Sequence, residues 1–356
     1  MNRLRYIDWG MMGALAFLAA AGLVTLASVA EEFFPRQLGW YLAALAIILL
    51  AVQVDWKRLG DHAWFRYGIY GLSVFLLVVS NLQSSTIRGT KSWIVVGGFQ
   101  FEPAELAKFA LILVLAYFFS RRHVEAWYGK NILVSFVLMA IPTALIMVHP
   151  DFGDGVVVVA VWVAFLLMGG VHTKRFLAGL AAAAVAMALM WTFVLKPYQQ
   201  DRVVSFLFPE RDPLGASYNV IQSKVAIGSG GLFGKGFGGG TQARLHFLPA
   251  AHNDFLFAAF AEEWGVVGGA ALLLTFTFFL YRVGSVGLRA KDNYSRLIAL
   301  GGGVLFAVQS FINVGSNLGL LPVTGLTFPF FSYGGSSVLT SALLIGIIQH
   351  IRVESR

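Results

Sequence analysis

The chain has 356 residues, of which 58% are hydrophobic and only 12% charged, a composition far too apolar for a soluble domain of this length. It contains no cysteine, which excludes disulfides, thiolate metal sites and a cysteine nucleophile. The formal net charge of +8 would suit a nucleic-acid partner, but the basic residues are distributed as membrane topology requires, so we expect no nucleic acid.

Ten apolar windows have the length of membrane-spanning helices, which need roughly 20 mostly apolar residues. The run from Trp9 to Val29 follows two arginines like a signal peptide, but it is longer than the apolar part of one, so we interpret it as an uncleaved first helix. We therefore predict an all-α polytopic membrane protein with ten transmembrane helices in a single domain, residues 1–356. The windows lie at about 9–29, 38–54, 67–82, 104–120, 131–148, 154–171, 176–195, 255–281, 296–318 and 335–351.

The basic residues predict the orientation of these helices. With a cytoplasmic N-terminus, the inner segments carry 16 Lys and Arg residues and the short outer loops only 3, as the positive-inside rule requires. Because the number of spans is even, both termini are then cytoplasmic. The long loop between the seventh and eighth spans, about 196–254, becomes extracellular.

Asp254 is the first candidate for chemistry, because it lies where this polar, glycine-rich loop enters the eighth helix. One interpretation is a helix N-cap, where aspartate is favoured because it accepts hydrogen bonds from free backbone amides. The other is a general base at a cavity that opens to the membrane. Both interpretations fit the sequence.

Four further charged residues lie inside or at the mouth of predicted spans. Glu105 and Lys108 are three residues apart and share a helix face, so they form either a structural ion pair or a site for an anionic ligand. Glu262 and Glu263 follow Asp254 by eight and nine residues, roughly 12 Å along a helix. Carboxylates at that depth are costly facing lipid, so structural pairing is the role that we expect for them.

The outer loop is basic, with Arg202 and Lys224 among its cations. A diphosphate-bearing lipid would require such residues, whereas contact with anionic headgroups is the alternative. Asp151 and Asp154 lie in a short outer turn, where a turn role is the simplest explanation. The irregular segment 320–337 contains proline and glycine but few charges, so at membrane depth it must line a cavity or be buried in protein.

Several motifs, in this order along the chain, resemble those of the shape, elongation, division and sporulation (SEDS) family, and within it the rod-shape-determining (RodA) branch. Ten membrane helices are also the architecture of that family. The similarity spans most of the chain. The motifs are Arg88-Gly89 with KSWI at 91–94, FEPAELAK at 101–108, HPDFG at 149–153, Tyr198-Gln199 with Arg202 and Phe206, AIGSGGLFGKGFGGGTQ at 226–242, FLPAAHNDF at 247–255, and LPVTGLTFPFFSYGGSS at 321–337.

The resemblance implies a peptidoglycan glycosyltransferase that polymerises lipid II outside the bacterial cytoplasmic membrane during cell elongation. It implies inversion at the anomeric carbon, undecaprenyl diphosphate as leaving group, and a class B penicillin-binding protein and the elongation machinery as partners. Asp254 matches the aspartate essential in the family, so we assign it the base role. Arg202 and Lys108 become candidates for sugar or diphosphate contact, with Glu105 orienting Lys108 and Lys224 as a further substrate contact.

The chain departs from the family pattern at three positions. Glu102 and Ala104 flank Pro103 where Gln and Ser are usual, and Ala250 replaces a common Glu. The missing Glu argues against a metal bridge beside Asp254. A divalent cation remains an option as cofactor, but the sequence shows no cluster of metal ligands.

Two other functions compete with the enzyme hypothesis. A lipid II flippase would also be polytopic, with Glu and Lys inside its spans, but it should show a polar path from the inner face, and none is evident in the sequence. A non-catalytic scaffold for a penicillin-binding protein would tolerate the loss of Asp254. The concentration of acidic residues on the outer side favours chemistry there.

Overall fold

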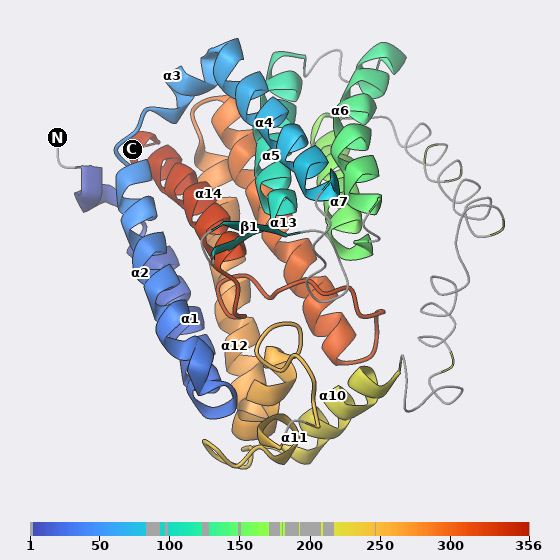
Figure 1. Cartoon of the computed structure of the whole chain (residues 1–356). Coiled ribbons are helices and arrows are strands. Elements are labelled where there is room, and N and C mark those ends of the chain that lie inside the picture. The colour runs from blue at the N-terminus through green and yellow to red at the C-terminus, as the bar shows by residue number, and fades with distance from the viewer. Residues whose placement is uncertain are drawn as a thin grey trace.

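The computed structural model describes residues 3–82, 93–96, 99–122, 128–148, 151–170, 217–245 and 247–355, with single residues at 179, 181, 192 and 208. It is a bundle of long helices (Figure 1). The elements are η1 (Arg3–Tyr6), α1 (Trp9–Val29), η2 (Glu31–Phe33), α2 (Phe34–Ala51), α3 (Trp56–Asp61), α4 (Ala63–Leu82), β1 (Ile94–Val96), β2 (Phe99–Phe101), α5 (Pro103–Arg121), α6 (Gly129–Met147), α7 (Phe152–Met168), α10 (Tyr218–Ser229), α11 (Thr241–Arg244), α12 (Leu256–Arg289), α13 (Asn293–Asn317) and α14 (Gly335–Glu354).

Within the described ranges, eight helices are long and apolar enough to cross a membrane, and α7 is a shorter apolar helix. These nine match nine of the predicted windows, and large apolar side chains such as Leu42, Phe75 and Leu274 are exposed on them, as lipid-facing residues are. The chain is thus an all-α polytopic membrane protein. The predicted span at 176–195 falls almost wholly outside the described residues, so the count of ten stays a prediction.

Helix α5 forms the centre of the bundle. It is apolar around its whole circumference and nearly all of its side chains are buried, which is typical of a helix enclosed by other helices. It packs against α4, α7, α13 and α14. A two-stranded antiparallel hairpin, β1 and β2, pairs Val95 with Gln100 and leads directly into α5. The sequence analysis did not predict this hairpin.

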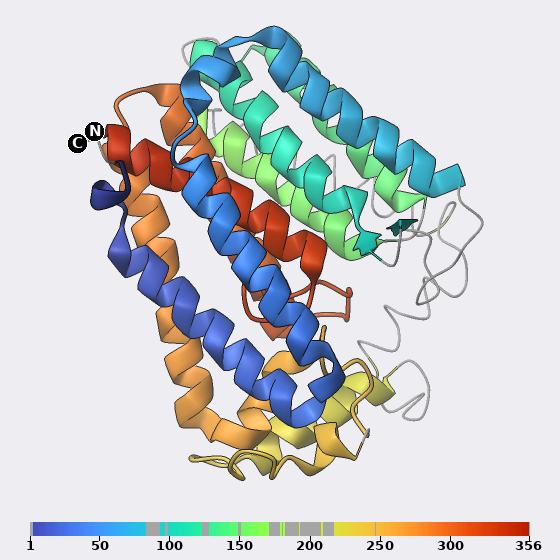
Figure 2. The ribbon, with the colours of Figure 1, turned by 60° about the vertical axis from the view of Figure 1, so that its left-hand side comes forward.

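The two ends of the chain lie side by side at one end of the bundle (Figures 1 and 2). The amide of Asp8 donates to Gln349 in α14 over 2.8 Å. The carboxylate of Asp8 also accepts from Arg282 in α12, with Nη2 to Oδ2 at 2.5 Å. Helices α10 and α11 lie at the opposite end, so the loop before Asp254 and the chain termini are separated by the length of the bundle (Figure 1).

Helix α12 has a kink at Gly265, whose φ of 66° and ψ of −167° are not helical. The glycine-rich loop that follows α10 fills the kink, because Gly231 accepts from the amide of Val266 at 2.9 Å. In the other direction, the amide of Gly236 donates to the carbonyl of Glu263, also at 2.9 Å. The loop therefore replaces helical hydrogen bonds that the kink removes.

Candidate active site

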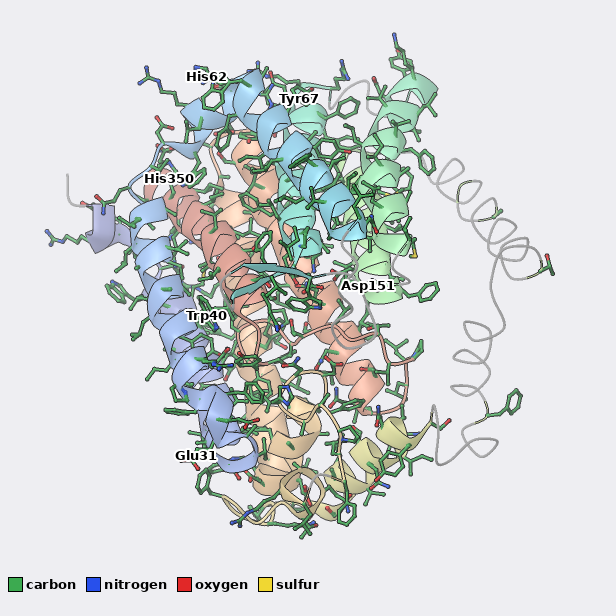
Figure 3. The ribbon with its side chains drawn as sticks, viewed as in Figure 1. Glu31, Trp40, His62, Tyr67, Asp151 and His350 are labelled. Atoms are coloured by element: carbon green, nitrogen blue, oxygen red, sulfur yellow. The ribbon has the colours of Figure 1, made fainter. Side chains whose placement is uncertain are left out.

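A cavity of about 250 Å³ lies between α2, the β-hairpin, the first turns of α5 and α7, and the segment 325–337. Trp40 in α2 and Asp151 before α7 approach it from opposite sides (Figure 3). Glu102, Glu105 and Asp154 add three more carboxylates to its lining. The prediction that the irregular segment 320–337 lines a cavity is confirmed for its residues Gly325, Leu326, Thr327 and Tyr333–Ser337.

A buried ion network supports one wall of this cavity. The ammonium of Lys108 is 2.9 Å from Glu105 Oε1 and 2.9 Å from Asp154 Oδ1. Helix α5 begins at Pro103, so Glu105 and Lys108 are both helical and lie one turn apart on one face. Asp154 lies in the first turn of α7. The Lys108 side chain is 0% exposed, so it faces the two carboxylates and not the cavity. The predicted Glu105–Lys108 ion pair is present, and Asp154 is a partner that the sequence did not reveal.

Glu102 and Asp151 lie just before α5 and α7 and crowd this network with negative charge. Burial raises the pKa of Asp151 to about 7, and the neighbouring Asp154 carboxylate contributes to the rise, although the Asp154 amide donates to Asp151 over 3.1 Å. Burial and the same like charges raise the pKa of Glu102 well above its usual range. Such a cluster binds protons or a cation more readily than isolated carboxylates do. Asp151 is the N-cap of α7, as its expected turn role requires.

Oxygen atoms of Glu102, Asp151 and Asp154 lie within 4.8 Å of one another. An all-oxygen carboxylate set of this kind fits a hard divalent cation such as Mg²⁺ or Ca²⁺. The sequence showed no such cluster, since the members are separated by about fifty positions. These three residues are therefore the ones that could hold a divalent cation beside the cavity.

Asp254 lies at the edge of the same cavity. The next residue, Phe255, is the N-cap of α12 and makes no side-chain cap bond, so the N-cap interpretation of Asp254 is wrong. A carbon attached to the Gly325 Cα would lie 3.9 Å from Asp254 Oδ2. Gly325 and Asn253 both line the cavity. The carboxylate of Asp254 therefore lies next to Gly325 and one residue after Asn253, although Asp254 is not itself among the lining residues.

Lys224, another predicted substrate contact, is not among the described lining residues of this cavity. Lys224 is exposed on α10, and its side chain lies against Gly319, just after α13. Arg202 lies outside the described residues. The structure therefore brings Glu105, Lys108 and Asp254 to one region and leaves Lys224 on the neighbouring surface.

Comparison with known proteins identifies the family of this chain. The FtsW/RodA/SpoVE model, described as cell cycle protein, matches residues 4–356. The chain belongs to this family. It is 34% identical to peptidoglycan glycosyltransferase MrdB of Escherichia coli (strain K12), over 96% of this chain and 92% of that one. It is 35% identical to the probable peptidoglycan glycosyltransferase FtsW of Coxiella burnetii, over 98% and 97% of the two chains.

Solved structures agree with this assignment. The rod shape determining protein RodA of Thermus thermophilus has a TM-score of 0.73 and 29% identity, covering 97% of this chain and 96% of that chain. A chain from work on "structural coordination of polymerization and crosslinking by a peptidoglycan synthase complex" has a TM-score of 0.85 and 33% identity, covering 98% of both chains. The fold of this FtsW/RodA/SpoVE-family protein is thus shared along nearly its full length.

In this family member, the paired glutamates of α12 hold the glycine-rich loop that follows α10. Glu262 Oε1 accepts from Lys235 Nζ at 2.7 Å and from the amide of Thr241 at 2.8 Å. Glu263 accepts from the amide of Gly238 at 3.1 Å and from the Ser28 hydroxyl. The structural pairing expected for the two glutamates is confirmed.

Two residues near Asp254 escaped the sequence analysis. Asn313 and Asn317 of α13 are 1% and 0% exposed, and both donate to the main-chain carbonyl of Asp254. The signal that could have found them is their spacing, because two amides four residues apart on one face of a membrane helix require buried partners.

Proposed function

We propose that this protein polymerises lipid II into glycan strands on the outer face of the bacterial cytoplasmic membrane, with Asp254 as general base. The chain is a peptidoglycan glycosyltransferase, the activity that the names of its relatives carry along nearly its full length. The observation that supports the finer proposal is that Asp254 Oδ2 lies next to Gly325, a lining residue of the acidic cavity at the first turns of α5 and α7.

The lining suits carbohydrate. Carboxylates accept hydrogen bonds from sugar hydroxyls, and the rings of Trp40, Trp93 and Tyr333 offer flat faces to the carbon side of a sugar. Binding sites commonly combine apolar and aromatic surface with a few placed polar groups. The cavity lies between helices, so a polyprenyl tail can remain in lipid while its sugar is held.

In the proposed step, the 4-hydroxyl of one lipid-linked N-acetylglucosamine attacks the anomeric carbon of a lipid-linked muramyl sugar. Asp254 takes the hydroxyl proton as the new C–O bond forms. The bond from the anomeric carbon to the diphosphate oxygen breaks, and undecaprenyl diphosphate leaves with the electron pair. One displacement inverts the anomeric centre. General-base help of this kind contributes about 10²- to 10⁴-fold in rate.

The leaving diphosphate needs positive charge, and the described lining supplies little of it. Arg36 is the basic side chain among those lining residues, whereas Lys108 is bonded to Glu105 and Asp154. We therefore propose that Lys108 organises the carboxylates and does not itself contact the diphosphate. A divalent cation held by Glu102, Asp151 and Asp154 would supply the missing charge when bound.

The flippase alternative gains no support from the described part of the chain. Below Lys108, α5 continues with eight apolar residues, Phe109 to Ala116, and all of them are buried. A flippase needs a path along which a sugar diphosphate can cross, and burying such a group without polar partners is costly. We therefore retain chemistry on the outer side.

The membrane orientation and partners follow from the same proposal. The two termini lie at one end of the bundle (Figure 2). Lys57 and Lys291 lie beside Glu354 near the end of α14, so we place this end in the cytoplasm. We propose a class B penicillin-binding protein and the elongation machinery as partners, which accords with a structural relative from a peptidoglycan synthase complex.

The experiment that tests the proposal is polymerisation of lipid II by the purified full chain, with and without a class B penicillin-binding protein, comparing wild type with Asp254→Asn. The substitution keeps the shape of the side chain and removes its basicity. Glycan polymer from wild type and none from the variant, with folding and partner binding unchanged, supports the proposal.

A further inference from the structure

The main chain at Asp254 is held from the side by α13. Asn313 Nδ2 donates to the Asp254 carbonyl at 3.0 Å, and Asn317 Nδ2 donates to the same oxygen at 2.8 Å. A carbonyl only accepts, so both amide nitrogens must face it. The two asparagines are four residues apart on one helix face, and both are buried. One backbone oxygen therefore receives two fixed donors.

Each asparagine also binds a second segment of the site. Asn313 Nδ2 donates to the carbonyl of Leu326 at 2.7 Å, and Leu326 follows Gly325 in the cavity wall. Asn313 thus joins the Asp254 segment to the part of the cavity wall that Gly325 and Leu326 form. A carbon built on Gly325 would lie 3.9 Å from Asp254 Oδ2, so this part of the wall is close to the carboxylate. This single side chain sets the position of the carboxylate relative to the cavity.

Asn317 fixes the helix that follows Asp254. Its Oδ1 accepts from the amide of Ala258, in the first turn of α12, at 3.1 Å. Its own carbonyl accepts from the Ser223 hydroxyl of α10 at 2.7 Å. Because Phe255 provides no side-chain cap, Asn317 caps α12 from a neighbouring helix. Asn317 therefore holds Asp254, the start of α12 and α10 together.

The amide at position 313 uses its donors and not its acceptor. Asn313 Oδ1 is buried and has no hydrogen-bond partner among the residues that the structure describes. A buried acceptor without a partner costs about 1 to 3 kcal/mol, which offsets part of what the two donated bonds contribute. The side chain is therefore placed for its two donors.

We propose that Asn313 and Asn317 are positioning residues for glycosyl transfer, which hold the Asp254 main chain against the Gly325 wall so that its carboxylate meets the attacking hydroxyl. The inference rests on the proposed base role of Asp254. A general base must lie within about 2.6 to 3.2 Å of the proton that it takes. A displacement of about 1 Å costs on the order of 100-fold in rate.

Two variants separate positioning from helix capping. Asn313→Leu removes both donors at similar size, together with the unpaired acceptor, and leaves the bond from the Ala258 amide to Asn317 in place. Asn317→Ala removes the donor to Asp254 and the cap on Ala258 together. Ser310→Ala is the matched control, because within the described part of the chain this buried hydroxyl bonds to α13 itself, at 2.8 Å to the Phe306 carbonyl and 3.1 Å to that of Ala307.

The full-length variants are assayed on lipid II with a class B penicillin-binding protein, and kcat, KM and the thermal unfolding midpoint are measured. We expect Asn313→Leu to lower kcat by about 10- to 100-fold with KM within about 2-fold, because this side chain is not among those lining the cavity. Its unfolding midpoint should stay above the assay temperature, and its partner binding should match that of wild type and Ser310→Ala.

Asp254→Asn is measured in parallel, so that failure of the positioning role can be distinguished from failure of the proposed base role of Asp254. If Asp254→Asn is inactive while Asn313→Leu turns over at the wild-type rate, the positioning role is refuted and the proposed function stands. Refutation also follows if Asn313→Leu is fully active and Asn317→Ala loses activity only in proportion to its loss of folded protein, since Asn317 would then act only as a cap. If Asp254→Asn polymerises normally, the proposed base role and the positioning inference both fail.

Discussion

Replacing Lys108 with methionine tests whether this residue organises the carboxylates of the cavity. Its side chain is 0% exposed and bonds to Glu105 and Asp154, which are themselves only 6% and 3% exposed. Lys108→Met therefore leaves two buried carboxylates without their cation. Removing one partner of a buried ion pair costs about 3 to 5 kcal/mol, so we expect the free energy of unfolding to fall by about that amount.

The assay is denaturant or thermal unfolding of the purified protein, with lipid II polymerisation measured on the same samples. Lys57→Met is the matched control, because Lys57 pairs with Asp292 at 3.2 Å but is 50% exposed, and its loss should cost no more than about 1 kcal/mol. The triple variant Lys108→Met, Glu105→Gln and Asp154→Asn also removes the two carboxylates that bond to Lys108, so most of the lost stability should return.

The result that would refute this reasoning is a Lys108→Met protein that unfolds like wild type but binds lipid II at least 10-fold more weakly. That outcome would make Lys108 a direct contact of the diphosphate. It would also require the ammonium to leave Glu105 and Asp154 when substrate binds.

Three further predictions concern charge, backbone and metal. Burial alone would raise the pKa of Asp292, but hydrogen bonds from the Ser295 amide and Lys57 outweigh burial and lower this pKa below 3.8. The stabilisation by the ionised carboxylate is therefore present at neutral pH and is lost as the pH falls through the lower pKa of the folded state. In thermal unfolding, Asp292→Asn should be less stable than wild type at pH 7 and equal to it well below pH 3.8, whereas a difference that does not change with pH would contradict the assignment. Gly265→Ala places a side chain on a residue with φ of 66°, so it should lower the free energy of unfolding by about 1 to 3 kcal/mol and expose the glycine-rich loop to protease. Gly284 lies in the same helix with open space around it, so Gly284→Ala should raise the free energy of unfolding by about 1 kcal/mol. Equal behaviour of the two variants would refute the role of the kink. Asp151→Asn should raise the Mg²⁺ concentration for half-maximal polymerisation by at least about 10-fold, and activity that is insensitive to chelator in wild type would contradict the cation site.

Hydropathy predicted most of the fold because spans such as α1, α5 and α14 are predominantly apolar over the length of a membrane crossing, and a single apolar span in lipid must be helical. The kink in α12 was not predicted. Gly265 occurs within a predicted span, and its conformation depends on a loop that fills the kink from outside the helix. The sequence around Gly265 does not indicate that this loop contacts it.

The candidate site was predicted where its residues are close in the chain. Glu105 and Lys108 share a helix turn, so their pairing follows from spacing. The third member, Asp154, lies 46 positions away and joins them only through the packing of α7 against α5. The asparagines of α13 reach Asp254 across 59 and 63 positions, which no motif in a single sequence reveals.

Polymerisation of lipid II by wild type and Asp254→Asn, each with the same class B penicillin-binding protein, tests the central claim most directly. We predict glycan polymer from wild type and a loss of at least about 100-fold in rate for the variant, with the same unfolding midpoint and partner binding. Equal rates from the two proteins would contradict the account, remove Asp254 as base and direct attention to Glu105, whose carboxylate lines the cavity.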